Sequence, residues 1–272
     1  MGRTNRIIVA VISIALIAFC AYRIIVARND EKAHMENSSN IISFKPAPPT
    51  VADTAEPDSA TLPVSTSQET PTDEETEDVP EEPIFFNQEI LDLQSRYKDA
   101  VGWITVPHTG IDYPFVQGAD NDFYLNHNMD GEETKAGAIF MDFRNYRDLY
   151  DSNIILYGHN MKNGTMFGGI KQYLDKGFFE ANNTGTVFLA DRTCDVEFFA
   201  LLVIPSVDGI IYGMNDSEAA AAAFLEHMEE VSRYYRDIGA TPNDMFITLS
   251  TCAYEFKDAR MVLIGLLSER RP

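Results

Sequence analysis

The sequence predicts a mostly β domain, either a barrel or a sandwich with inserted helices, in the part of the chain after residue 83. Short apolar or alternating runs recur there, and Gly, Asn and Asp separate most of them, which is typical of strands joined by turns. Of the whole chain, 45% is hydrophobic, enough to form a core. The preceding residues have a different composition, so we expect one domain and an N-terminal extension.

Residues 7–27 form an almost wholly apolar run that we expect to be a transmembrane signal-anchor. At about 1.5 Å per residue in a helix, its length matches the hydrocarbon core of a bilayer. Arg3 and Arg6 favour a cytoplasmic position for residues 1–6. The opposite flank carries Arg23, Arg28 and Lys32, so charge alone does not fix the orientation. A cleaved signal peptide would need small residues at the cleavage site, where Phe19 and Cys20 stand instead. We therefore expect a single-pass protein of the cell membrane.

Residues 28–83 are predicted to form an extracellular stalk. From Pro46 to Pro83 there are eight prolines, eleven acidic residues and no Lys or Arg. Such a segment cannot bury enough apolar surface to offset its ordering entropy, so we expect it to stay extended and solvated. A stalk rich in Ser, Thr and Pro beyond a membrane anchor fits a position outside the cell.

Residues 84–272 are predicted to form one domain, with 28 acidic and 15 basic residues. The whole chain has a net charge of −21, which excludes nucleic acid as an expected partner because a phosphate backbone needs a basic surface. Three cysteines, one of them in the apolar N-terminal run, cannot form a disulfide scaffold.

The elements of this domain begin with a helix expected from Asn87 to about Val101, with Ile90 and Leu91 near its apolar face. A second helix is expected from an N-cap at Asn215 or Asp216 to about Arg236. The expected strands are Ile111–Val116, Ala138–Asp142, Asn153–Tyr157, Thr186–Ala190, Val196–Ile204, Met245–Thr251 and Arg260–Ser268.

Metal and nucleotide motifs are missing from the sequence. The segment from Asn126 resembles the start of an EF-hand loop, but its twelfth position is Gly137, where a bidentate Glu is required. HExxH, zinc-finger spacing, Walker A, GxGxxG and GxSxG do not occur. We therefore expect no metal and no cofactor.

Cys252 is the candidate nucleophile. It follows an apolar strand and opens a polar stretch, a position where a thiol can be reached while its backbone is held rigidly. A free thiol needs a nearby cation or base to react at neutral pH. If the strands on either side of the polar stretch are neighbours, Arg260 can reach Cys252. A buried core cysteine and a surface arginine would have the same spacing.

His159 is the candidate base, since it also follows a strand and histidine is the residue type that serves most often as a general acid or base. A histidine beside a glycine, as here with Gly158, is also common in purely structural positions. Cys194 is expected in a hairpin turn with no role of its own. A disulfide between Cys194 and Cys252 stays open as an alternative, and it would abolish the nucleophile.

Together these segments resemble the sortases, membrane-anchored cysteine transpeptidases of Gram-positive bacteria. TLSTC at residues 248–252 matches the family's TLxTC motif, Arg260 falls where its active-site arginine is expected, and YGHNM at residues 157–161 matches the segment of its catalytic histidine. The resemblance covers roughly residues 84–272. The pattern TLSTC-x-YEF-x-x-AR and the long helix before it are most similar to class B.

The resemblance implies a closed β-barrel of about eight strands, with an N-terminal helix and a long inserted helix before the catalytic strand. It also implies that Cys252 attacks the Thr carbonyl of an LPxTG-, SPxTG- or NPxTN-like sorting signal on a surface protein. His159 then protonates the leaving amine, and Arg260 stabilises the oxyanion or holds the substrate backbone. An amine, expected on a peptidoglycan precursor, resolves the thioacyl-enzyme as an amide.

The resemblance further implies that Asn121, Leu125, Tyr157 and Ser250 contact the sorting signal. Two alternatives to cell-wall joining stay open. A pilin-polymerising sortase would use a lysine amine instead of the peptidoglycan amine. A non-catalytic β-domain that binds the wall would tolerate Cys252→Ala without loss of function.

Overall fold

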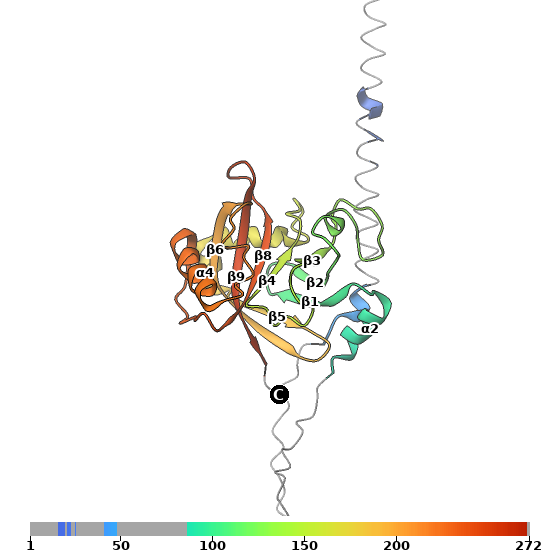
Figure 1. Ribbon diagram of the computed structural model, residues 1–272. Coiled ribbons are helices and arrows are strands. Elements are labelled where there is room, and N and C mark those ends of the chain that lie inside the picture. The colour runs from blue at the N-terminus through green and yellow to red at the C-terminus, as the bar shows by residue number, and fades with distance from the viewer. Residues whose placement is uncertain (1–15, 20, 23–24, 26–40, 48–85, 271–272) are drawn as a thin grey trace, which may run out of the picture. The chain divides into compact units, whose positions relative to one another are not determined.

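A computed structural model describes residues 16–19, 21–22, 25, 41–47 and 86–270. In these residues one sheet has the order β5-β1-β2-β3-β4-β8-β9-β6-β7, and β5 also pairs with β6. The first eight strands of this order therefore close into a barrel (Figure 1). β7 pairs with β6 and is not part of the closed ring. The strands are β1 (Ala100–Val106), β2 (Ile111–Val116), β3 (Ile139–Met141), β4 (Asn153–Tyr157), β5 (Thr184–Phe188), β6 (Thr193–Pro205), β7 (Ser232–Tyr235), β8 (Met245–Cys252) and β9 (Ala259–Glu269).

The helices are short. They are η1 (Ile42–Phe44), α2 (Gln88–Arg96), η2 (Phe123–Leu125), η3 (Phe167–Leu174), α3 (Lys176–Ala181) and α4 (Glu218–Val231). They pack on both cores of the barrel: η3 adds Phe167, Ile170 and Tyr173 to the interior cluster, whereas α4 packs on the outside. Asn87 caps α2, because its side chain accepts a hydrogen bond from the Ile90 amide. The mostly β prediction is confirmed, and the barrel is the correct one of the two expected architectures.

Alternation along the strands separates an interior core from an exterior one. Ile247 and Leu249 of β8 belong to the barrel interior, while Phe246 of the same strand packs outside against Phe224 and Met228 of α4. Successive side chains of a strand point to opposite faces, so the face of each later residue of β8 follows from these three. Figure 1 shows α4 lying along the outer side of β6.

The helix predicted from Asn87 to about Val101 is too long. It ends at Arg96, Tyr97 is already extended, and residues 100–106 form β1. The β-branched and aromatic side chains of this segment, AVGWITV, fit a pleated surface that is buried on both sides.

The second predicted helix is also too long at both ends. Its N-cap is Ser217, whose side chain accepts from the Ala220 amide, whereas Asn215 has a positive φ of 53°. Residues 232–235 leave the helix and pair with β6 as β7. This pairing satisfies backbone groups of both strands, which propensity alone does not indicate.

The predicted signal-anchor, residues 7–27, falls mostly outside the described residues, as do residues 1–6 and most of the predicted stalk, residues 28–83. Within the described part of the chain, no helix is long and apolar enough to cross a membrane.

Candidate active site

Three strand ends bring the predicted catalytic residues to one edge of the barrel. β4 and β8 are parallel neighbours, with Tyr157 opposite Ser250. β8 and β9 are antiparallel, with Cys252 directly opposite Arg260. Cβ atoms of directly opposed residues lie about 4.5–5.5 Å apart, so Arg260 is within reach of the thiol. The expected proximity of these two residues is therefore present in the structure.

The chain that leaves β4 stays beside β8. The Gly158 amide donates to the Ser250 carbonyl at 3.2 Å, and the Thr251 hydroxyl donates to the Gly158 carbonyl at 2.7 Å. These bonds continue the register of the two strands by two residues, which places His159 alongside Cys252. Both side chains fall on the outer face by alternation, because Ile154 of β4 points into the barrel interior.

The His159 ring is held by a backbone carbonyl. Its Nε2 lies 2.7 Å from the Leu125 carbonyl oxygen. A carbonyl only accepts, so Nε2 carries a proton and Nδ1 is the nitrogen that can take up or release one. The following residue, Asn160, donates from its amide to the Cys252 carbonyl at 2.7 Å and ties the histidine loop to the end of β8.

Next to the thiol, the outer face carries two aromatic hydroxyl groups. The Tyr157 hydroxyl donates to Asp142 at 2.9 Å, and the Tyr212 hydroxyl lies 2.8 Å from the Ser250 hydroxyl. The two rings are stacked, with centroids 6.3 Å apart. Burial raises the pKa of Tyr212 to about 12, and burial followed by the Asp142 charge raises the pKa of Tyr157. Both phenols are therefore neutral hydrogen-bonding groups at physiological pH.

Asp142 is the buried centre of this polar network. Its carboxylate accepts two hydrogen bonds from the Arg144 guanidinium, both at 2.8 Å, and one from Asn121 at 3.0 Å. Burial acts to raise the pKa of Asp142, but the bonds from Arg144 and Tyr157 outweigh it and hold the pKa below its usual value. Asp142 is therefore an anchoring carboxylate that stays ionised.

Asn153 fixes the segment that carries Tyr212. Its amide donates to the Ile211 carbonyl at 3.1 Å and to the Gly213 carbonyl at 2.8 Å. Its side-chain oxygen accepts from the Thr248 hydroxyl at 2.8 Å. Because Asn153 belongs to β4 and is fully buried, the segment is tied to a rigid strand.

The four predicted substrate contacts are thus in different situations. Tyr157 is half-buried on the outer face beside the thiol. Ser250 points to the same face, but it is buried and its hydroxyl is bonded to that of Tyr212. The Asn121 amide is used within the protein, since it donates to Asp142 and accepts from the Phe143 amide at 3.0 Å. Leu125 presents its carbonyl to His159.

Three residues of the site were not predicted from the sequence: Asp142, Arg144 and Tyr212. Asp142 directly follows the apolar run of β3, a signal similar to that of His159 and Cys252. Tyr212 gave no such signal, because it lies in an irregular segment 38 residues from Ser250.

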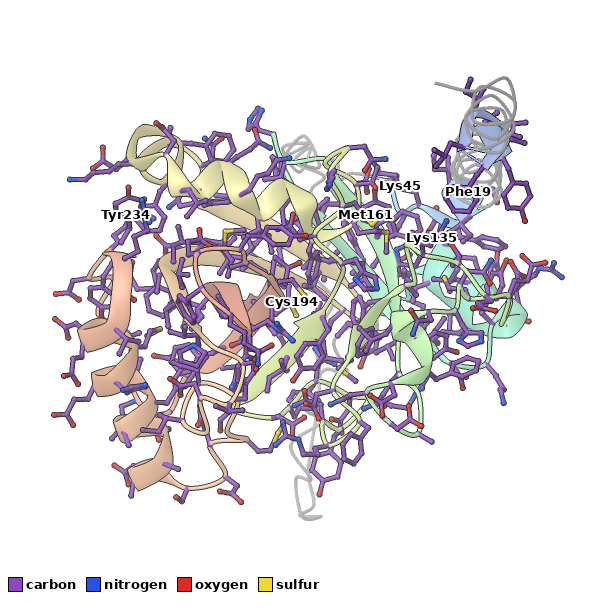
Figure 2. The ribbon with its side chains drawn as sticks, turned by 90° about the horizontal axis from the view of Figure 1, so that it is seen from above. Phe19, Lys45, Lys135, Met161, Cys194 and Tyr234 are labelled. Carbon is purple, nitrogen blue, oxygen red and sulfur yellow. The ribbon has the colours of Figure 1, made fainter. Side chains whose placement is uncertain are left out.

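Cys194 is not in a turn but in β6, where it is fully buried (Figure 2). Burial raises the pKa of its thiol. Both Cys194 and Cys252 are free, so the disulfide alternative is wrong. In the part of the chain that the structure describes, no three His, Cys, Asp or Glu side chains are grouped so that they could hold a metal ion.

Comparison with known proteins places these residues in a family context. The family model of the Sortase domain matches residues 104–268. "Sortase B" of Listeria monocytogenes is 39% identical over 181 residues, which cover 66% of this chain and 74% of that protein. A crystal structure of Clostridium perfringens sortase B has a TM-score of 0.62 and 36% identity, covering 65% of this chain and 98% of that one. A Staphylococcus aureus sortase B–substrate complex has a TM-score of 0.64 and 29% identity, covering 68% and 87%.

Proposed function

Because this chain belongs to the sortase family of cysteine transpeptidases and is most similar to its class B members, we propose that Cys252 is its nucleophile, with His159 and Arg260 as partners. The observation that carries this assignment is the register of the strand ends, which sets Cys252 opposite Arg260 and beside the chain that bears His159.

The first half-reaction cleaves a sorting signal after Thr. The Cys252 thiolate attacks the Thr carbonyl carbon, and the oxygen gains a negative charge that Arg260 stabilises. The imidazolium of His159 gives a proton to the leaving amine as the peptide bond breaks. A thioacyl-enzyme remains. We expect an LPxTG-, SPxTG- or NPxTN-like signal on the outer face, near Tyr157, and the existence of a substrate complex of the Staphylococcus aureus sortase B supports a substrate-binding site in this class.

The second half-reaction joins the cleaved protein to an amine, which we propose to be that of a peptidoglycan precursor. The amine nitrogen attacks the thioester carbon, the C–S bond breaks, and neutral His159 accepts the amine proton. An amide then links the surface protein to the wall.

The test is intact-mass spectrometry of the full-length chain, purified in mild detergent and mixed with peptides of the three signal types. We expect an adduct truncated after Thr, released when hydroxylamine is added. Cys252→Ala should form none. Cys194→Ala, which removes the buried thiol instead, is the matched control and should still form it. Absence of an adduct with every peptide, on folded protein with a free Cys252 thiol, would refute the assignment.

We also propose that residues 7–27 anchor the protein in the cell membrane as a single span, with residues 84–272 outside the cell. The apolar run and its basic N-terminal flank support this location. Fractionation tests it: the full chain should stay with membranes after alkaline carbonate washing, and a chain that lacks residues 1–27 should be soluble. Protease added to intact protoplasts should digest residues 84–272. If these residues survive, the domain is inside the cell and the proposed location is wrong.

A further inference from the structure

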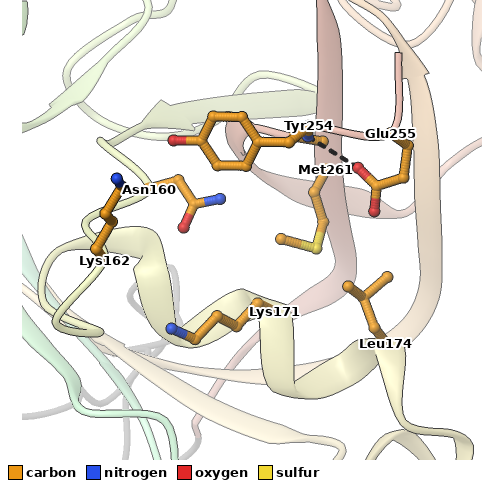
Figure 3. Close-up of a pocket in the computed structure, with 8 residues that line it drawn as sticks. Asn160, Lys162, Lys171, Leu174, Tyr254, Glu255 and Met261 are labelled. Atoms are coloured by element: carbon orange, nitrogen blue, oxygen red, sulfur yellow. Dashed lines mark hydrogen bonds between the residues drawn. The ribbon is translucent and has the colours of Figure 1, made fainter.

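A cavity of about 450 Å³ lies beside the predicted catalytic residues and has no part in the chemistry above (Figure 3). Asn160, Ala253 and Met261 line it, and each directly follows one of the three predicted catalytic residues in sequence. Asn160 also binds the Cys252 carbonyl at 2.7 Å. The cavity wall and the nucleophile therefore share a rigid connection.

The cavity opens on the interior side of the strand ends, whereas the polar network around Asp142 lies on the outer face of the barrel. Met261 packs in the barrel interior, whereas its neighbour Arg260 falls on the outer face with Cys252. None of Tyr157, Ser250 and the other residues of the outer network lines the cavity. A sorting signal bound on the outer face would leave the cavity open to a second molecule.

Positive charge distinguishes this cavity from the rest of the domain. Residues 84–272 contain 28 acidic side chains but only six lysines. Two of these six, Lys162 and Lys171, line the cavity. Neither forms an ion pair or hydrogen bond with any residue that the structure describes. Figure 3 shows both ammonium groups on the Asn160 side and Glu255 on the far side of Met261. The Glu255 carboxylate already accepts a hydrogen bond from the Tyr254 amide, 2.9 Å long.

A glycine allows the two lysines to come together. A Cβ at Gly168 would lie 2.5 Å from the Met161 carbonyl oxygen, a contact that no larger residue could make. The Lys162 segment therefore packs directly on η3, which carries Lys171. The bridge between Asn160 and Met166 closes the same segment.

We infer that this cavity binds the acceptor of the second half-reaction through an anionic group, a carboxylate or a phosphate, carried by the same molecule as the attacking amine. This inference rests on the proposed transpeptidase function and adds the class of its acceptor. Ion pairs with Lys162 and Lys171 hold the acceptor so that its amine reaches the thioester carbon. The C–N bond forms as the C–S bond breaks, the proton passes to His159, and the sulfur leaves as thiolate.

The experiment uses one acyl-enzyme and compares its aminolysis by pairs of acceptors, in which one member carries an anionic group and the other does not. Triglycine and triglycinamide share the same amino end, but only triglycine carries a carboxylate. Ethanolamine phosphate and ethanolamine form a second pair that tests phosphate. Aminolysis rates are measured by mass spectrometry with the full-length chain in detergent, for wild type, Lys162→Gln, Lys171→Gln, their double variant and Lys176→Gln. Lys176 is the matched control, since it lies outside the cavity and pairs with Glu180.

We expect the wild type to favour the anionic member of at least one pair by about fivefold to tenfold at low salt, and the preference to shrink in 0.5 M NaCl. The pair with the larger preference identifies the anion as carboxylate or phosphate. The double variant should lose the preference, and Lys176→Gln should keep it. Equal rates within both pairs on wild type, or a preference that survives the double variant, would overturn the inference while leaving the acyl-enzyme intact. Failure to form the acyl-enzyme would overturn the proposed function and the inference with it.

Discussion

At the scale of single residues, Arg260 owes its position to strand register and its chemistry to the guanidinium group. Among the residues described, the hydrogen bond that it donates goes to the Ala259 carbonyl at 3.2 Å, so most of its N–H groups remain for a substrate. The fixed fork of donors suits an oxygen that becomes negative during the reaction.

We predict that Arg260→Gln lowers kcat/KM for sorting-signal cleavage by about 10²–10³-fold, the usual effect of removing an oxyanion donor. Arg260→Lys should keep the charge but lose the fork, and recover only part of the activity. Peptide cleavage assayed by chromatography measures both. The matched control is Arg233→Gln, at an exposed position of β7 away from the site. If Arg233→Gln lowered kcat/KM by the same factor, the result would contradict a specific role of Arg260.

Asp142 gives a stability prediction, because its buried charge is held by three neighbouring side chains. Asp142→Asn replaces a charged acceptor by an amide that cannot satisfy the same donors, and we expect a loss of about 2–4 kcal/mol in the free energy of unfolding at pH 7. Urea denaturation measures it. Asp130→Asn, at an exposed position, should change the free energy by less than about 0.5 kcal/mol.

The pH dependence of this effect has a definite sign. The pKa of Asp142 is lowered in the folded protein, so its stabilisation is present above the unfolded value of 3.8 and is lost as pH falls through the folded pKa. The difference in unfolding free energy between wild type and Asp142→Asn should therefore be constant between pH 5 and 7 and should shrink below about pH 4. A difference that grows on acidification would contradict the assigned role.

At the scale of elements, β4 supports the active site through Asn153 at its start as well as through its C-terminal end. We predict that Asn153→Ala destabilises the protein by about 2–4 kcal/mol, since buried carbonyl and hydroxyl partners are left unsatisfied. The released segment of Tyr212 should also be cut faster by protease. Urea denaturation and limited proteolysis measure the two effects.

The control for Asn153 is Asn183→Ala, which removes one exposed hydrogen bond to Glu197. It should cost less than about 1 kcal/mol and leave proteolysis of the Tyr212 segment unchanged. If both variants behaved alike, Asn153 would not be the residue that fixes this segment.

The elements also show where local sequence patterns fail. Seven strands were predicted within a few residues of their bounds, since alternation and turn residues are local signals. The local pattern instead predicts β1 as the end of one helix and β7 as the end of another. The state of both segments is decided by pairing, β1 with β2 and β5, and β7 with β6. Tertiary contacts override propensity in such segments.

At the scale of the whole molecule, a segment far before the domain in sequence packs against it. Ile41 is buried with Ile90 and Leu93 of α2, and the Phe44 ring contacts Tyr97 edge-on at 6.4 Å. Lys45 forms an ion pair with Asp112. The predicted stalk thus contains a short part that contributes to the core.

We predict that Ile41→Asp lowers the free energy of unfolding by about 1–3 kcal/mol, the value of one buried aliphatic side chain. The neighbouring Ile42 is 61% exposed, so Ile42→Asp is a matched control that should have little effect. Thermal unfolding of both full-length variants measures the difference. Equal melting temperatures would show that the segment does not stabilise the domain.

The sequence by itself determined the mostly β domain, most strand positions and the family motifs around His159, Cys252 and Arg260, because each of these depends on neighbouring residues in the chain. Only the tertiary structure decided the closure of the barrel through β5 and β6, the network around Asp142 and the lysine-lined cavity. Their parts are far apart in sequence: the bond from Arg144 to the Tyr212 carbonyl spans 68 residues. Such contacts join residues that are distant in the chain, so no local pattern records them.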